Sequence, residues 1–336
     1  MEENKILCIS FNQDFSCFAL GTTKGFCVFG IEQSRLRERF KRNFNGGVGI
    51  IELLYKSNLV ALVGGGPNPV FVPTKVIIWD DYQNKGIAEL EYDSPVRAVK
   101  LKRDIIVVVV DTNVFVYDFR NLNLRQTFKT CPNPKGLITI SSSEKKVIAY
   151  PSTEEGKVVV VNLETGSSTT IEAHKHSISA MCLSPEANLL VTASSEGTLF
   201  RVWDTTRGEK VGEFRRGKSV AEIYSVNFSQ DGKFIVTNSN RGTVHIYTLS
   251  QDGDVTNKES KFSKIVPGFS GVYGCCEFSV QPEIYTQAFF GWQNSPTLSV
   301  MAITIEGKFV KYSMITEKGK VILKPENSPE IPSLFN

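Results

Sequence analysis

Short hydrophobic runs alternate with turns rich in Gly, Pro, Asn and Asp along nearly the whole chain. Within these runs apolar residues recur at every second position, the period of a half-buried β-strand, whereas helical periodicity is scarce. The longest apolar run, "IIVVVV" at 105–110, is β-branched, as in a buried strand. The pattern therefore predicts an all-β fold.

One strand pattern recurs seven times: a small-residue turn, then an alternating strand that ends in an aromatic residue or Asp. The copies are "KGFCVFG", "TKVIIWDD", "TNVFVYD", "GKVVVVNL", "GTLFRVWD", "GTVHIYTL" and "GKFVKYSM". Their first strand residues are Phe26, Val76, Val114, Val158, Leu199, Val244 and Phe309, with separations of 50, 38, 44, 41, 45 and 65 residues. A period of about 45 residues is typical of a propeller blade. We expect residues 1–336 to form a single seven-bladed β-propeller of four-stranded antiparallel blades.

Two of these intervals exceed the period, and the surplus residues should form loops. In the first, "GGGPNPVFVPTK" at 64–75 contains three prolines, which are incompatible with regular strand pairing, so a Pro-rich protruding loop is expected. In the second, the surplus falls in or near residues 250–274. Long loops on a rigid scaffold often carry function.

The composition restricts the location and the partners of the protein. With 38 basic and 35 acidic residues the net charge is +3, too small to indicate nucleic-acid binding over the whole surface. Seven cysteines without CxxC spacing suit reduced thiols in a cytosolic protein, with no structural metal. The acidic N-terminus does not predict a secretory signal, and no apolar run is long enough to cross a bilayer. No cofactor is expected, and any anion site must be local.

Two consecutive arginines, Arg215 and Arg216 in "GEFRRGKSV" at 212–220, lie in a predicted strand. Neighbouring strand residues point to opposite faces, so the two guanidinium groups cannot share one ligand. In an outermost strand each would lean into a different cleft between blades. Hydroxyl residues occur on both sides, in "TASSEGT" at 192–198 and in "TNSNRGT" at 237–243.

This pattern predicts two phosphate sites, since guanidinium and hydroxyl groups suit phosphate oxygens. Site 1 comprises His174, Ser177, Ser194, Thr198 and Arg215, and site 2 comprises Arg216, Ser239 and Thr243. A histidine with a pKa near neutrality would make phosphate binding modestly pH-dependent. The alternative is a solvated strand edge, with hydroxyls that satisfy turn backbone groups.

The chain resembles the PROPPIN family of WIPI-type propellers, whose hallmark is a Phe/Leu-Arg-Arg-Gly strand matched by "FRRG" at 214–217. The other matching stretches are "FNQDFSCFALGTTKGFCVF", "ALVGGGPNPVFVPTKVIIWDD", "AHKHSIS" and "TASSEGTLFRVWDTTRGEKVGEFRRG". Its length resembles that of the compact, core-only members. Ser219 departs from the more basic or bulkier residue that would help site 2.

The resemblance implies binding of phosphatidylinositol 3-phosphate and phosphatidylinositol 3,5-bisphosphate at sites 1 and 2. It implies a monomeric, cytoplasmic effector or adaptor that binds reversibly to endosomal, vacuolar or autophagic membranes. The long loop would insert into the membrane, and an autophagy protein would bind the loop at 64–75. The alternative for the loop at 64–75 is a Pro-stiffened connection with no ligand. The residues suited to insertion are Lys261, Phe262, Lys264, Ile265, Val266 and Phe269.

Two other functions are weighed against lipid binding. A plain WD-repeat scaffold would bind proteins and need neither paired arginines nor an amphipathic long loop. An enzyme would need a convergent acid, base or metal set, and three histidines without metal spacing or a nucleophile motif do not supply one. "GGVG" at 46–49 and "GGG" at 64–66 lack the Lys-Ser/Thr of a phosphate-binding loop and are predicted to be turns.

Overall fold

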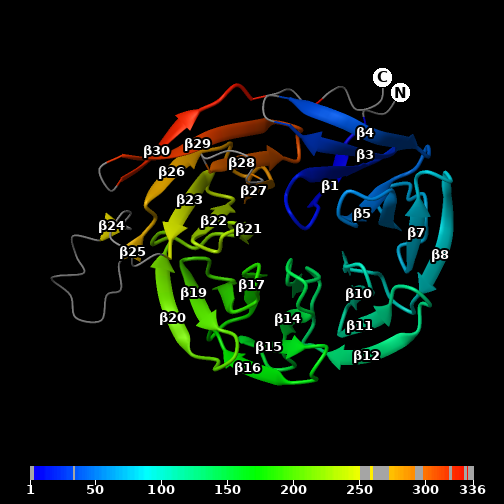
Figure 1. Ribbon diagram of the computed structural model, residues 1–336, viewed down its shortest axis with the longest axis horizontal. Coiled ribbons are helices and arrows are strands. Elements are labelled where there is room, and N and C mark those ends of the chain that lie inside the picture. Colours follow the sequence, from blue (N-terminus) through cyan, green and yellow to red (C-terminus); the bar gives the residue numbers. More distant parts are fainter. Residues whose placement is uncertain are drawn as a thin grey trace. The chain divides into compact units, whose positions relative to one another are not determined.

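The protein is all-β in a computed structural model that describes residues 4–32, 35–249, 258–259, 272–291, 298–317, 320–328 and 331. Within these residues there are seven four-stranded antiparallel sheets, each with its strands in chain order except for one insertion (Figure 1). Each sheet is one blade of a seven-bladed β-propeller, as predicted. The seven repeat copies are the third strands of the seven blades, so each copy of the repeat corresponds to the same strand of its blade.

The chain divides into two compact units, and the first contains Met1–Leu137 together with Ile305–Phe309 and Ser328–Asn336. Its three blades run in chain order from β1 to β12. The strands are β1 (Ile6–Phe11), β2 (Cys17–Thr22), β3 (Gly25–Ile31), β4 (Leu36–Asn43), β5 (Val48–Leu53), β6 (Leu59–Gly64), β7 (Lys75–Asp80), β8 (Lys85–Glu91), β9 (Ala98–Leu101), β10 (Ile105–Val110), β11 (Asn113–Asp118) and β12 (Leu124–Lys129).

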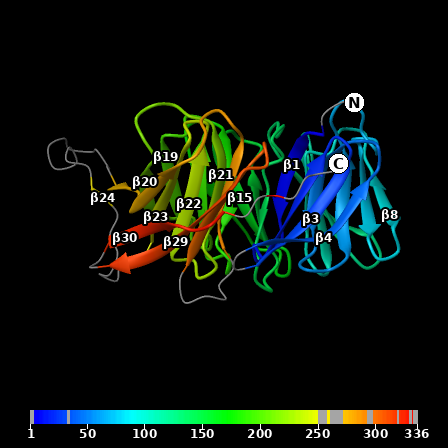
Figure 2. The same cartoon turned by 90° about the horizontal axis from the view of Figure 1, so that it is seen from above.

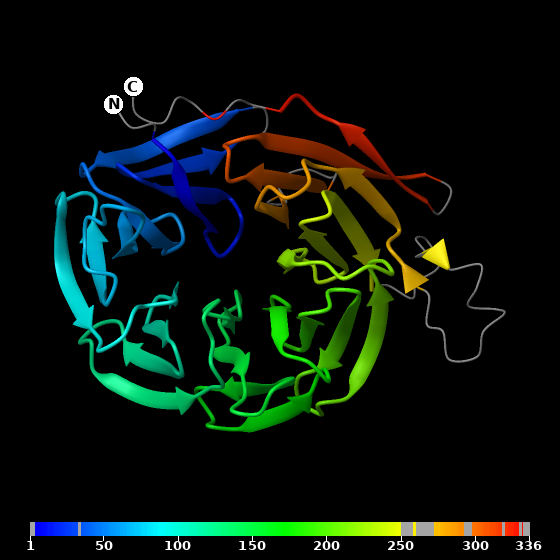
Figure 3. The ribbon, with the colours of Figure 1, turned by 180° about the vertical axis from the view of Figure 1, so that it is seen from behind.

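The second unit contains Ile138–Thr304 and Val310–Asn327 and holds the other four blades, seen from behind in Figure 3. Their strands are β13 (Thr139–Ile140), β14 (Val147–Pro151), β15 (Lys157–Asn162), β16 (Ser168–Glu172), β17 (Ile178–Leu183), β18 (Leu189–Ser194), β19 (Leu199–Asp204), β20 (Lys210–Arg215), β21 (Ile223–Phe228), β22 (Phe234–Ser239), β23 (Thr243–Thr248), β26 (Cys276–Ser279), β27 (Thr286–Phe290), β28 (Ser299–Thr304), β29 (Phe309–Glu317) and β30 (Lys320–Pro325).

The long interval of the repeat is an insertion between the third and fourth strands of one blade. The strand β26 pairs directly with β23, although a separate ribbon of β24 (Lys258–Glu259) and β25 (Val272–Tyr273) comes between them in the chain. The surplus therefore lies where the repeat predicted it. The ribbon strand β25 packs against β20, the outermost strand of the preceding blade.

In the second unit, the apolar side chains at alternate strand positions form a core between neighbouring blades. In β19, Phe200 and Val202 are fully buried and pack with Phe214 of β20 against residues of β21–β23. Tyr247 of β23 is completely buried there, with its ring centroid 5.1 Å from that of Phe214. Figure 2 shows these strands lengthwise. This packing holds β20 in place, and with it the two arginines at its end.

The loop at 64–75 folds back on the earlier glycine segment instead of standing alone. The N–H of Gly47 donates to the carbonyl of Asn68 (2.6 Å), and the carbonyl of Gly47 accepts from Gly65 and Val70. A Cβ atom on Gly64 would lie 1.8 Å from the carbonyl oxygen of Phe71, so a larger residue does not fit there. Val70 and Phe71 are half-buried against the core, while residues 66–69 are exposed.

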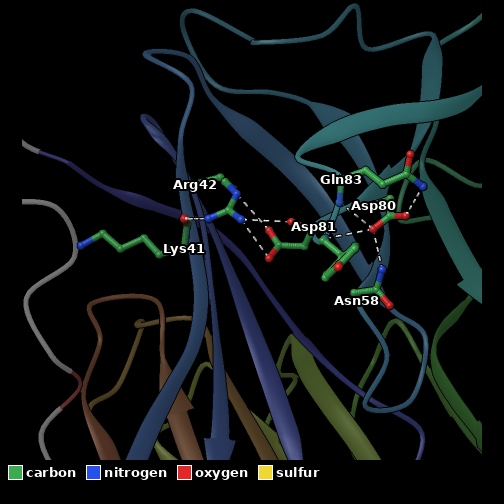
Figure 4. Close-up of polar contacts among 7 residues, drawn as sticks. Lys41, Arg42, Asn58, Asp80, Asp81 and Gln83 are labelled. Carbon is green, nitrogen blue, oxygen red and sulfur yellow. Dashed lines mark hydrogen bonds and ion pairs between the residues drawn. The ribbon is translucent and has the colours of Figure 1, made fainter.

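A polar cluster joins the first two blades of the first unit (Figure 4). Arg42 of β4 forms an ion pair with Asp81 after β7, with 3.0 Å between Nε and Oδ1. Its Nη2 also donates to the Asp81 carbonyl and to Oδ2, at 3.1 and 3.0 Å. The adjacent Asp80 accepts hydrogen bonds from Asn58 and from the side chain and backbone of Gln83. Charge-assisted bonds of this kind fix orientation between elements.

Candidate functional site

Arg215 is the last residue of β20, which is the outermost strand of its blade because it pairs only with β19 in the sheet order, and Arg216 follows directly after it. Phe214 points toward the core shared with β21–β23, so strand alternation directs Arg215 to the opposite face, where Glu213 bonds to Arg201 (2.9 Å). Arg216 lies just beyond the strand on the other side. The divergence of the two guanidinium groups stays a prediction.

Arg216 is buried, with 8% of its surface exposed, and its partners are backbone oxygens. Its Nε donates to the carbonyl of Gly197 (2.6 Å), and its Nη2 donates to the carbonyl of Ser219. Among the described residues no carboxylate pairs with it. Burial lowers the pKa of Arg216, yet arginine stays charged. A buried cation with only carbonyl partners favours an anionic ligand.

The residues of site 1 gather at one end of the β17–β20 sheet. The antiparallel register places Ser194 opposite Ile178, at the start of β17, and Arg215 opposite Leu199, at the start of β19. The amide of Arg216 donates to the carbonyl of Thr198 (2.9 Å), which ties the β18–β19 turn to the end of β20. Ser194 is buried, whereas Ser177 is exposed.

His174 does not titrate near neutrality, so the expectation of a near-neutral pKa was wrong. Burial lowers the pKa of His174 to about 4, with a further contribution from the positive charge of Arg201. Its Nε2 lies 2.9 Å from Thr192 Oγ1, which also accepts from Trp203 Nε1 at 2.9 Å. The Thr192 hydroxyl can then donate to a neutral imidazole. In the protein without ligand, His174 is therefore uncharged at pH 7.

The residues of site 2 lie at the same end of the next blade. Ser239 is buried and faces Ile223, at the start of β21, while Thr243 begins β23. Between them the amide of Arg241 lies 3.4 Å from Ser239 Oγ. The Arg241 guanidinium donates to the carbonyl of Val220 (2.9 Å), and its charge contributes to the lowered pKa of Arg216.

Two basic residues near these sites were missed by the sequence analysis. Arg201 lies beside His174 and donates to the carbonyl of Ala173 (2.8 Å), and Arg241 lies within the quoted stretch "TNSNRGT". The sequence signal for Arg241 was its place between Ser239 and Thr243. Arg241 also supplies a cation beside Arg216 at the site where Ser219 is not basic.

The predicted membrane-inserting residues lie outside the described residues. They are Lys261, Phe262, Lys264, Ile265, Val266 and Phe269. No helix in the described part of the chain is long and apolar enough to span a bilayer. Over the same residues, no group of three or more His, Cys, Asp and Glu side chains is arranged to hold a metal ion.

A sequence profile of the PROPPIN family matches residues 5–279. This chain belongs to the PROPPIN family. Among its relatives, autophagy-related protein 18e of Arabidopsis thaliana is 35% identical over 312 residues, covering 91% of this chain and 82% of the relative. Autophagy-related protein 18 of Dictyostelium discoideum is 35% identical over 267 residues, covering 79% and 70%. The chain is thus a PROPPIN-family propeller related to autophagy proteins.

Two solved structures share this fold at low sequence identity. Kluyveromyces lactis Hsv2 with a complete loop 6CD superposes with a TM-score of 0.81 at 22% identity, covering 98% of this chain and all of that one. A complex of KlAtg21 with the coiled coil of AgAtg16 gives a TM-score of 0.76 at 21% identity, covering 97% and 100%. These similarities support the seven-bladed architecture.

Proposed function

We propose that this PROPPIN chain binds phosphatidylinositol 3-phosphate and phosphatidylinositol 3,5-bisphosphate through sites 1 and 2. It would thereby act as a peripheral adaptor on autophagic and on endosomal or vacuolar membranes. The residues of the insertion at 261–269 would add a third membrane contact. The relatives named for autophagy support the pathway, and the arrangement of the two arginines supports the ligand.

The observation that carries the proposal is the buried guanidinium group of Arg216, which has no carboxylate partner among the described residues and directly follows Arg215 in the chain. A guanidinium group offers five N–H donors, and the bonds of Arg216 to the carbonyls of Gly197 and Ser219 use two of them. A phosphate would supply both the missing negative charge and acceptors for further donors. Arg215 would supply the same chemistry at site 1, together with neutral His174 and the hydroxyl of Ser194.

Two modest sites are sufficient for membrane binding when both face one bilayer. Binding of the second headgroup is then effectively intramolecular, which raises avidity by roughly 10² or more. A change at either arginine should therefore reduce vesicle binding far more than it reduces binding of a soluble headgroup at the other site.

The test is flotation of the Arg215→Thr/Arg216→Thr variant with vesicles that contain phosphatidylinositol 3-phosphate or unphosphorylated phosphatidylinositol. We expect the variant to lose the binding that depends on the 3-phosphate. The single variants should reduce the headgroup stoichiometry from two to one. Arg207→Thr is the matched control, because exposed Arg207 pairs with Asp204 at the opposite end of these strands.

Flotation that is unaltered in the double variant, or that ignores the 3-phosphate, would refute recognition of the 3-phosphate by these arginines and favour the WD-repeat scaffold. Replacement of Phe262 and Phe269 with Ser tests the proposed membrane contact of the insertion independently of sites 1 and 2. It should weaken vesicle binding and leave the binding of soluble headgroups unchanged.

We also propose that the loop at 64–75 binds a protein partner. Val72 is 56% exposed, next to a segment that the glycine contacts hold rigid. The complex of KlAtg21 with an Atg16 coiled coil supports partner binding by propellers of this fold. An Atg16 coiled coil is the probe, and Val72→Asp should weaken its binding at least tenfold without altering vesicle flotation. Equal affinity for the variant and the unaltered chain would refute the proposal.

A further inference from the structure

An acidic side chain from the neighbouring blade reaches into site 1. Glu155, in the turn between β14 and β15, accepts a hydrogen bond at Oε1 from the backbone N–H of Ser177, at 2.9 Å. Ser177 is exposed and belongs to site 1 with His174 and Arg215. A carboxylate therefore lies at the site at which a phosphate is proposed to bind.

The position of this carboxylate is set by the backbone beside it. The carbonyl of Gly156 accepts from the amides of Ala173 and His174, at 3.0 and 2.9 Å. Gly156 has φ +77°, and a Cβ atom there would lie 2.1 Å from the carbonyl oxygen of His174. Only glycine fits this left-handed, close approach without strain. The β14–β15 turn is thus locked against residues 173–177, with Glu155 directed to the Ser177 amide.

Unlike the neighbouring carboxylate of Glu154, the carboxylate of Glu155 has no cationic partner among the described residues. Lys157 pairs with Glu154 at 2.8 Å and with Glu172 at 3.1 Å. Within the described residues no Lys, Arg or His side chain forms an ion pair with Glu155. Its negative charge is therefore directed toward site 1 without an ion pair among the described residues.

We propose that Glu155 is an internal competitor that lowers the affinity of site 1 and favours headgroups of lower charge. This inference rests on the phosphoinositide binding proposed above. A carboxylate oxygen and a phosphate oxygen accept the same backbone N–H, so the headgroup must displace Glu155 or bind beside its charge. The repulsion grows with the number of phosphates on the headgroup. Site 1 would then prefer phosphatidylinositol 3-phosphate to the bisphosphate.

The test uses the full chain with Arg216→Thr, which leaves site 1 as the only site. Isothermal titration calorimetry measures the binding of inositol 1,3-bisphosphate and inositol 1,3,5-trisphosphate, the soluble headgroups of the two lipids. Glu155→Gln keeps an oxygen acceptor for the Ser177 amide and removes the charge. We expect Glu155→Gln to tighten headgroup binding roughly fivefold. Two unit charges about 4 Å apart in water interact with about 1 kcal/mol, which corresponds to this change in affinity. The gain should be larger for the trisphosphate and should shrink at high salt.

Glu154→Gln is the matched control, because it makes the same charge change one residue away. No gain for Glu155→Gln, or a gain no larger than that for Glu154→Gln, overturns the inference. The proposed function has its own criterion in the same experiment. If Arg215→Thr in the Arg216→Thr background leaves headgroup binding unchanged, phosphoinositide recognition at site 1 is refuted, whatever Glu155 does.

Discussion

At the scale of single residues, Arg215 and Arg216 are consecutive and yet differ in their surroundings. Arg216 is buried among carbonyl oxygens, while the carbonyl of Arg215 accepts a hydrogen bond from the hydroxyl of Tyr247 at 3.3 Å. The Tyr247 ring is part of the core between two blades, so this bond anchors the strand end to the interior. The arginine backbone is held rigid, and a rigid backbone reduces the ordering cost of ligand binding.

His174 allows a prediction about stability against pH. Its pKa is about 4 in the folded protein and 6.5 in the reference state, so between these values the unfolded chain binds a proton that the folded chain excludes. This contribution to stability is complete above pH 6.5 and is lost as the pH falls toward 4. Lowering the pH from 7.5 to 4.5 should therefore destabilise the unaltered protein more than the His174→Gln variant. Thermal unfolding at each pH measures this as a larger fall in melting temperature.

His174→Gln is a suitable comparison because its amide can still reach the hydroxyl of Thr192, and other acid-titrating groups cancel in the difference. Parallel pH profiles for the two proteins would show that folding does not lower the pKa of His174. When a headgroup occupies site 1, the pH profiles of the unaltered protein and the His174→Gln variant should differ less, because a nearby phosphate raises the pKa of an imidazole.

At the scale of elements, the loop at 64–75 depends on close backbone contacts that only glycine permits. Gly64→Ala would put a Cβ atom 1.8 Å from the carbonyl oxygen of Phe71, and backbone cannot move away as a side-chain end can. We expect this variant to lose about 2 kcal/mol or more of unfolding free energy, as overpacking usually costs. Chemical denaturation followed by tryptophan fluorescence measures the change, and Trp79 packs on the same core.

Gly30→Ala provides the control for this prediction. A Cβ atom on Gly30 would meet its nearest neighbours at 3.8 Å, an ordinary contact distance, so this substitution should change the stability by less than about 1 kcal/mol. Similar losses for Gly64→Ala and Gly30→Ala would mean that the loop yields easily. The loop would then not be a rigid surface for a partner.

At the scale of the whole molecule, the proposed activities fall in different units. All residues of sites 1 and 2, and the insertion between β23 and β26, belong to the second unit, whereas the loop at 64–75 belongs to the first. A variant at one function should therefore leave the other unchanged, which the paired vesicle and coiled-coil measurements can check. With a net charge of only +3, membrane selection must come from local sites and their combined avidity.

The sequence by itself determined the features that depend on local geometry. The pleat of a strand alternates side chains whatever the fold, so the adjacency of Arg215 and Arg216 is enough to predict that they diverge. The turn and strand pattern repeated at blade length, so the third strand of every blade could be predicted. The insertion before β26 was located because it lengthened one interval of that repeat.

Only the tertiary structure decided the environment of these residues. The burial that lowers the pKa of His174 arises in the packed blade, where its Nε2 lies 2.9 Å from Thr192 Oγ1, and a sequence pattern does not encode that environment. Glu155 meets Ser177 across a boundary between blades, 22 residues apart in the chain. Charge, burial and hydrogen bonding act through distances in space, and those distances exist only once the blades have packed.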